Sequence, residues 1–139
     1  MKILVDFDGT CVTHDFPEVG SDIGAIPVLK ALVEKGHQLI LFTMRCDHTF
    51  MPDSLDPSIQ NIKGHFLLDA IEWFKENDIP LYGINTDPQQ SSWTLSPKAY
   101  GELIIDDIAI GCPLIYGKHR KPFVDWTEIS KLLKQRNIL

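Results

Sequence analysis

Short apolar runs recur along the chain, and each one ends in polar or acidic residues. Continuous apolar runs of this length are typical of strands buried on both faces, as in parallel sheets. We therefore predict four main strands and a shorter fifth one at Cys112–Tyr116. The four runs, with the polar residues that close them, are Lys2–Asp6, Gln38–Thr43, Pro80–Asn85 and Leu103–Asp107.

Between these runs, apolar residues recur at helical spacing, which predicts helices that each bury one face. The first helix should end at Gly36, a residue type common just beyond a helix, and the second near Asn77. Ser96 followed by Pro97 predicts another helix start, and Asp125 should cap the last helix. The periodic positions are Ile26, Leu29 and Val33; Leu67, Ile71 and Phe74; and Trp126, Ile129 and Leu133.

This alternation predicts an α/β fold in one domain spanning residues 1–139. We expect a doubly wound, Rossmann-like parallel sheet with helices on both faces, giving three α/β/α layers. The strand before Asp6 should be central, with the strands that end at Thr43 and Asp106 on either side of it.

Polar side chains at the strand ends should meet, because ligands of open α/β sheets bind outside the carboxyl ends of the strands. Asp6 and Asp8 repel each other at this spacing, and a divalent cation relieves such repulsion. Asp106 and Asp107 end another apolar run in the same way. The alternative for the first pair is a simple turn at Asp8-Gly9.

The net charge is −6, with scattered basic residues, which argues against a nucleic-acid surface built on bulk charge. A phosphorylated substrate is compatible with this charge, because a bound metal reverses the local sign. Cys11, Cys46 and Cys112 form no CxxC pair and are typical of reduced thiols in a cytoplasmic protein. No neighbour in the sequence activates Cys11 as a nucleophile. No signal peptide or membrane-spanning run is expected.

Together, the predicted strand ends supply acids for a cation, the hydroxyl of Thr43, and Lys98 shortly before the last acids. Phosphoryl transfer needs a metal and fixed donors around the phosphoryl oxygens. A carboxylate can also accept the phosphoryl group and divide one difficult step into two.

The chain resembles the haloacid dehalogenase-like superfamily, of the phosphatase type. The first motif of that superfamily, Asp-x-Asp-x-Thr, matches the stretch from Asp6 to Thr10. The second motif matches Thr43, the third Lys98, and the fourth Asp106 with Asp107. The resemblance covers residues 2 to about 112 and implies a Mg²⁺-dependent phosphomonoester hydrolase.

The resemblance also implies a role for each matching residue. Asp6 would be the nucleophile and a Mg²⁺ ligand, while Asp8 would bind the metal through its carbonyl and act as general acid and base. Thr43 and Lys98 would hold the phosphoryl oxygens. Asp106 would bind Mg²⁺ directly and Asp107 directly or through water.

The gaps between motifs leave no room for a cap domain, so loops, a second subunit or a large substrate should complete the site. The loops at residues 11–22, 46–62 and 86–96 are expected to form its walls. Substrate contacts are expected from Thr10, Arg45, His48 and Trp93. The alternatives are that Arg45 pairs with Asp47 or a helix end, that Trp93 pins its loop, and that Lys98 is a solvated surface lysine.

Three other functions stay open on the sequence. A response-regulator receiver uses similar residues in a different order. A phosphate-binding scaffold without activity, or a phosphotransferase that uses an alcohol as acceptor, would carry the same residues. The expected partner is a phosphorylated small molecule or macromolecule, with no membrane or nucleic acid and with a possible homo-oligomer.

Overall fold

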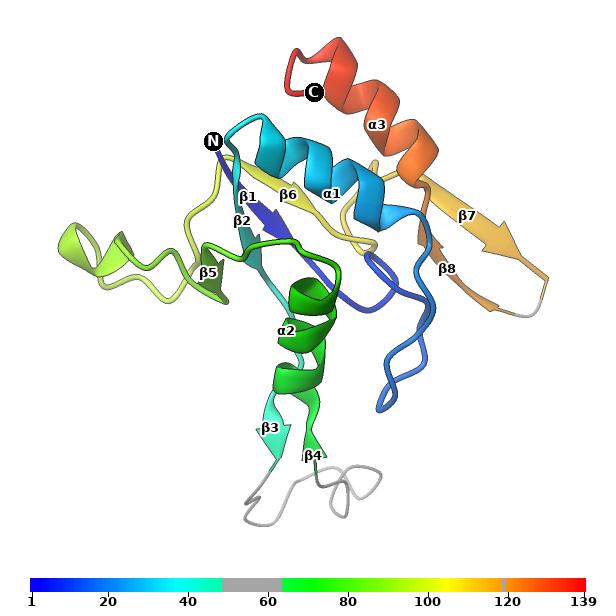
Figure 1. Cartoon of the computed structure of the whole chain (residues 1–139), viewed down its shortest axis with the longest axis horizontal. Helices are drawn as coiled ribbons and strands as arrows, with labels where there is room; N and C mark the ends of the chain where they lie inside the picture. The colour runs from blue at the N-terminus through cyan, green and yellow to red at the C-terminus, as the bar shows by residue number, and fades with distance from the viewer. Residues whose placement is uncertain (49–63, 119) are drawn as a thin grey trace.

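The computed structural model describes residues 1–48, 64–118 and 120–139, and it has an α/β fold around a four-stranded parallel sheet (Figure 1). The strands are β1 (Lys2–Val5), β2 (Gln38–Leu41), β5 (Gly83–Ile84) and β6 (Leu103–Ile105), in the order β5-β2-β1-β6. The prediction of a central first strand is confirmed. Val5 pairs with Leu41 on one side and Ile105 on the other, so these strands end level with one another.

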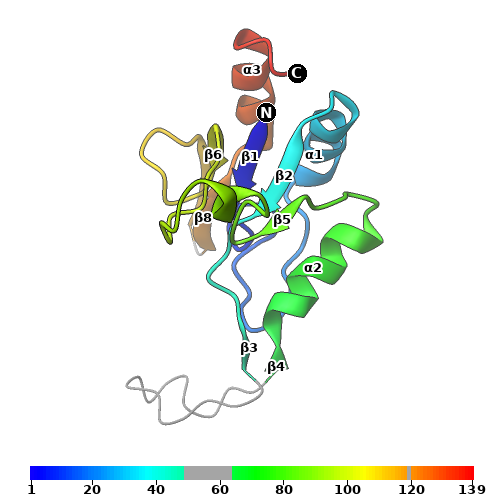
Figure 2. The same ribbon diagram turned by 90° about the vertical axis from the view of Figure 1, so that its left-hand side faces the viewer.

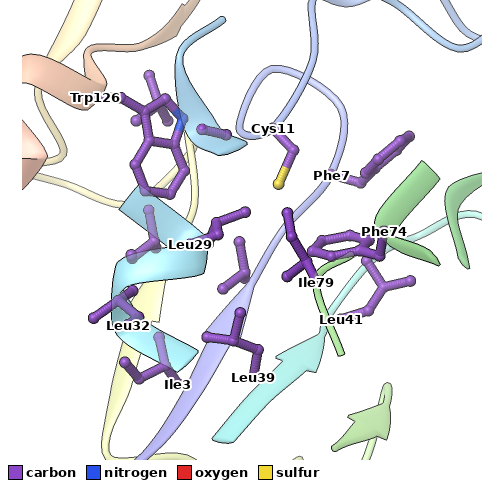
Figure 3. Packing of buried hydrophobic residues seen from close by; sticks show 14 of the residues in the cluster. Ile3, Phe7, Cys11, Leu29, Leu32, Leu39, Leu41, Phe74, Ile79 and Trp126 are labelled. Atoms are coloured by element: carbon purple, nitrogen blue, oxygen red, sulfur yellow. The ribbon is translucent and has the colours of Figure 1, made fainter. Parts of the chain in front are cut away.

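The three α-helices of the described residues pack against one face of this sheet. They are α1 (Ala25–Glu34), α2 (Phe66–Glu76) and α3 (Trp126–Gln135). Ile3 and Val5 point to this face and join the main core with Leu29 of α1, Phe74 of α2 and Ile129 of α3. Figure 2 shows α1 and α2 on the same side of the sheet, and Figure 3 shows the core between them.

The other face carries no α-helix among the described residues, so the prediction of helices on both faces is wrong. Leu4 and Ile40 point to this face and pack against Ala99, from the segment that joins β5 to β6. That segment contains one 3-10 turn, η1 (Gln90–Ser92). The helix predicted from Ser96-Pro97 does not form, because only a few residues separate Pro97 from β6.

Just before β6, the same segment runs close against the sheet. A Cβ at Gly101 would lie 2.6 Å from Cγ of Leu4. Ser96 does use its hydroxyl as a local cap, but it accepts the amide of Lys98 in a turn. The segment therefore covers the sheet as an irregular layer.

Two short antiparallel pairs complete the structure. Strands β3 (Asp47–His48) and β4 (Gly64–His65) pair where the chain leaves and re-enters the described part. The predicted strand at Cys112–Tyr116 corresponds to β7 (Leu114–Gly117), which pairs with β8 (Arg120–Val124) in a hairpin outside the main sheet. Arg120 and Lys121 begin β8.

The predicted helix ends are confirmed. Gly36 adopts φ +83° just beyond α1, in the left-handed region that glycine enters most easily. The carboxylate of Asp125 accepts the amides of Thr127 and Glu128 at the start of α3. None of the helices in the described ranges is long and apolar enough to cross a membrane.

Candidate active site

A cleft of about 530 Å³ opens at the carboxyl edge of the parallel sheet. Each of the four strands is followed by a residue that lines it, as the topology predicts for a ligand site. Besides the apolar Phe42, Met44 and Ile108, the lining residues are Asp6, Asp8, His14, Thr43, Asn85, Asp106 and Asp107.

The loop after β1 is anchored by Phe7. Its carbonyl accepts the amides of Thr10, Cys11 and Val12, which folds the loop tightly. Its ring is fully buried and packs edge-on against Trp73 at 5.6 Å between centroids. With Phe7 held in the core, Asp6 and Asp8 on either side of it line the cleft.

Three acids form a cluster that could hold a metal ion. Asp6, Asp106 and Asp107 each offer a carboxylate oxygen, and these oxygens lie within 4.8 Å of one another. Thr10 ties the cluster together, because its hydroxyl donates to Asp6 at 2.9 Å and accepts the amide of Asp107 at 3.0 Å. Thr10 is fully buried. The expectation that Thr10 contacts substrate therefore has no support in this geometry, and its hydroxyl positions two acids.

Burial shapes the ionisation of these acids. Desolvation raises the pKa of Asp6 to about 7, reinforced by Asp106 and Asp107 and opposed by hydrogen bonds from the amide of Phe7 and the hydroxyl of Thr10. The pKa of Asp107 is also raised, first by burial, while His14 acts to lower it. A carboxylate held in this way gains most from a positive charge placed beside it.

His14 is a site residue that the sequence interpretation missed. Its Nε2 lies 3.1 Å from a carboxylate oxygen of Asp107. Gly9 makes this approach possible, because a Cβ there would lie 2.1 Å from Nε2 of His14 and 2.8 Å from the Asp107 carboxylate. Gly9 also has φ +83°. Gly9, which lies within the first motif, was the one sign in the sequence that another side chain packs closely against this loop.

Asn85 is the second residue that was missed. It follows β5 in the left-handed conformation, with φ 54°, and its Oδ1 accepts the amide of Thr43 at 2.8 Å. The Thr43 hydroxyl in turn accepts the amide of Arg45 at 3.1 Å. Since these oxygens already accept, the Asn85 NH₂ group and the Thr43 hydroxyl hydrogen are left as donors at the cleft. The strand-end rule applied to Thr43 would also have identified Asn85.

Arg45 is buried and pairs with Asp8. Its Nε and Nη2 each lie 2.7 Å from a different oxygen of the Asp8 carboxylate. Two further hydrogen bonds run to the carbonyls of Pro17 and Glu18, and the guanidinium lies between the rings of Phe7 and Phe16. The alternative pairing with Asp47 is wrong, since that carboxylate accepts the amides of Leu67 and Leu68. Contact between Arg45 and a leaving group stays a prediction, one that would require the pair with Asp8 to open.

The segment between β5 and β6 does not bring its predicted residues to the cleft. Lys98 is exposed and does not line it. Trp93 is 61% exposed and packs edge-on against Tyr100. Because β6 runs parallel to β1, this segment must return to the amino end of the sheet, where the Tyr100 ring lies 5.6 Å from Nζ of Lys2.

Two remaining expectations concern His48 and Cys11. The side chain of His48, and residues 49–62 of the predicted loop at 46–62, lie outside the described residues. Cys11 is fully buried, its thiol donates to the carbonyl of Asp6, and burial raises its pKa well above the usual value. These surroundings agree with the expectation that Cys11 is not a nucleophile.

A solved structure of a conserved protein from Bacteroides thetaiotaomicron matches nearly the whole chain. It is 32% identical, covers 98% of this chain and 91% of its own, and superposes with a TM-score of 0.69. The chain belongs to the same family as this protein. No protein-family model and no curated protein matches the chain.

The family relation extends over the sheet and the cleft, since the match leaves almost no part of the chain uncovered. The Bacteroides relative is known here as a conserved protein, and this description suggests no activity for the chain. The function has to be argued from the side chains that line the cleft.

Proposed function

We propose that this chain is a Mg²⁺-dependent phosphomonoester hydrolase of the haloacid dehalogenase-like type, without a cap domain. The observation that carries this proposal is the cluster of Asp6, Asp106 and Asp107, with carboxylate oxygens within 4.8 Å of one another at the carboxyl edge of the sheet. Donors from Thr43 and Asn85 line the same cleft. Acids beside hydroxyl and amide donors suit a phosphoryl group and its metal ion.

The residues present fit Mg²⁺, which prefers hard oxygen ligands. Asp6, Asp106 and Asp107 would hold it with their carboxylates, and Asp8 with its backbone carbonyl. The raised pKa of Asp6 supports a cation at this place, because a positive charge there offsets the cost of the buried carboxylate. When bound, Mg²⁺ would neutralise charge on the phosphoryl oxygens.

In the proposed reaction a carboxylate oxygen of Asp6 attacks phosphorus, and the bond from phosphorus to the leaving oxygen breaks. Thr43 and Asn85 hold the phosphoryl oxygens through their free donors. Asp8 protonates the leaving oxygen and then takes a proton from water. That water attacks phosphorus, which releases phosphate and regenerates Asp6. Lys98 receives no role here, because it does not line the cleft.

The pair between Asp8 and Arg45 sets a condition on this reaction. Each Asp8 oxygen accepts one hydrogen bond from Arg45 and keeps a second lone pair for the leaving oxygen or water. Asp8 has to act as acid and base from the orientation that this pair fixes. We therefore expect Arg45 to act as a positioning residue for the Asp8 carboxylate.

The test is hydrolysis of p-nitrophenyl phosphate with Mg²⁺ and with a chelator. The wild-type protein should be active only with the metal, and Asp6→Asn should be inactive with its fold intact, because an amide is a poor nucleophile. Mass spectrometry of protein quenched in acid should find a phosphorylated peptide containing Asp6. Asp78→Asn is the matched control, since Asp78 lies outside the cleft at φ 53°, a conformation that asparagine tolerates. Turnover by Asp6→Asn would reject the aspartyl-phosphate.

A further inference from the structure

A second cavity of about 380 Å³ adjoins the cleft, and we call it the basic groove. It lies between the loop after β1 and strand β8. His14 lines both the groove and the cleft, so the two are contiguous. The other groove residues used below are Thr13, Asp15, Ser21, Arg120 and Lys121.

The charge of the groove is opposite to that of the cleft. Arg120 and Lys121 are both exposed, and neither side chain forms an ion pair or hydrogen bond with another residue in the described ranges. Among the described residues, the one acid that lines the groove is Asp15, which accepts a hydrogen bond from the hydroxyl of Thr13. On a chain of net charge −6, two neighbouring cations that have no partner among the described residues favour an anion as ligand beside the acidic cleft.

The walls of the groove are fixed by the backbone. Thr13 and Ser21 exchange hydrogen bonds, since the Thr13 amide donates to the Ser21 carbonyl and the Thr13 hydroxyl accepts the Ser21 amide. The amide of Val124, at the end of β8, donates to the carbonyl of Gly9. These bonds hold the hairpin against the loop that carries Asp6 and Asp8, so the groove keeps a defined position relative to the cleft.

We propose that the basic groove binds a second anionic group, a phosphate or a carboxylate, on the leaving-group side of the substrate. This inference rests on the proposed function, because the transferred phosphoryl group then lies in the cleft. The preferred substrate is a small phosphomonoester with an anion at each end. Thr13 and Asp15, which line the groove, suit hydroxyl groups on the connecting carbon chain.

The test compares alkanediol bisphosphates of increasing length with the corresponding alkyl monophosphates. We expect kcat/KM to favour the bisphosphate by about tenfold or more at one preferred length, since a charge-assisted hydrogen bond has that effect. Arg120→Ala and Lys121→Ala should each reduce this preference toward one. Lys118→Ala is the matched control, because Lys118 lies in the same hairpin but outside the groove. It should keep the preference.

Other outcomes overturn the proposal. An equal loss of preference in Lys118→Ala would mean that the hairpin acts by diffuse charge. A preference for a 5′-phosphorylated oligonucleotide over every bisphosphate would assign the groove to a polynucleotide.

A binding measurement separates the groove proposal from the hydrolase proposal, because it needs no turnover. Calorimetry would measure binding of the bisphosphate to Asp6→Asn, with and without Arg120→Ala. If Arg120 affects binding while the wild-type protein hydrolyses nothing, the groove stands and the hydrolase proposal fails.

Discussion

The loop after β1 and the segment joining β5 to β6 both begin at the carboxyl edge of the sheet, and both are rich in polar residues. Beyond Asn85, which directly follows β5, the joining segment contributes no described side chain to the cleft, whereas the β1 loop contributes several. The β1 loop folds back on Phe7 within a few residues and stays at the edge. The joining segment has to reach the start of β6, at the other end of the sheet.

The two regions also use buried polar groups differently. In the β1 loop, Thr10 holds the acids of the cleft. In the joining segment, the buried Gln90 donates to the carbonyls of Ser96 and Lys98 and accepts the amide of Tyr100. Gln90 therefore satisfies the backbone of an irregular layer. A buried polar residue in this fold can therefore serve either a site or the backbone of a covering layer.

The largest effect should come from removing a metal ligand. Asp106→Ala should raise the Mg²⁺ concentration for half-maximal activity at least about a hundredfold, because one of three clustered carboxylates is lost. Asp87→Asn removes an acid from the joining segment, where Asp87 pairs with Lys2 at 2.6 Å, and should leave the Mg²⁺ requirement unchanged. If the two variants change the Mg²⁺ requirement equally in a titration, the metal is not bound specifically by the acids at the cleft.

The next effect concerns the pair that holds Asp8. Arg45→Ala should lower the free energy of unfolding by about 3 kcal/mol, because it removes one partner of a largely buried ion pair. It should also reduce kcat, roughly ten- to a hundredfold, since Asp8 loses its fixed position. Arg45→Lys keeps the charge without the two-point contact. Its stability and its kcat should lie between those of the wild-type protein and Arg45→Ala. Urea unfolding and steady-state kinetics measure both effects, with the exposed Arg136→Ala as the control.

A contrary result for Arg45 is also informative. If Arg45→Ala raises kcat at unchanged stability, the pair restrains Asp8 and does not position it. If only KM rises, and only for some leaving groups, Arg45 contacts the substrate as the sequence suggested.

The stability of the metal-free protein should depend on pH through Asp6 in the β1 loop and Asp87 in the joining segment, and the two contributions should have opposite signs. Asp6 has a pKa of about 7 in the folded state against 3.8 as the ordinary value, so its contribution is complete below pH 4 and is lost as pH rises through 7. The loss can reach a few kcal/mol. The pKa of Asp87 is lowered by its hydrogen bond from Lys2, so its contribution is present above the ordinary pKa and is lost in acid.

Thermal unfolding in chelator from pH 4 to 8 measures this dependence. Asp6→Asn should flatten the fall toward pH 8, and Mg²⁺ should restore wild-type stability there. A wild-type profile that rises over this range would contradict the raised pKa of Asp6.

The smallest effect should come from the joining segment. Lys98→Ala and Trp93→Ala should change kcat/KM for p-nitrophenyl phosphate by less than about threefold, because neither residue lines the cleft. His14→Ala, which removes the partner of Asp107, should have a larger effect than either. A loss of about a hundredfold in Lys98→Ala would return Lys98 to the phosphoryl group, as the family resemblance implies.

The sheet could be predicted because local information determines it. Residues 3–5 and 39–41 are apolar throughout, and the crossover between the two strands allows one handedness, which favours their parallel pairing. Asp6, Thr43 and Asp106 were then brought together by register alone. The helix beginning at Ser96 failed because its capping signal was satisfied by a turn, within a connection too short for a helix.

The side-chain pairs that were not predicted depend on contacts distant in sequence. His14 meets Asp107 across 93 positions, and no local pattern announces that approach. The pair between Arg45 and Asp8 likewise spans 37 positions and depends on how the loop at Pro17 closes over the site. The chemistry of each residue was visible in the sequence, but the choice of partner was not.

The order β5-β2-β1-β6 also has a kinetic consequence. The strand nearest the start of the sequence lies between two others, and its pairing with β6 joins Ile3 to Leu103. During synthesis, one edge of β1 stays unpaired until about a hundred further residues have been added and β6 is available. Until then an apolar strand edge is open to other chains, and chaperones act on such species. Because Asp106 arrives with β6, the acid cluster forms in this late step of folding.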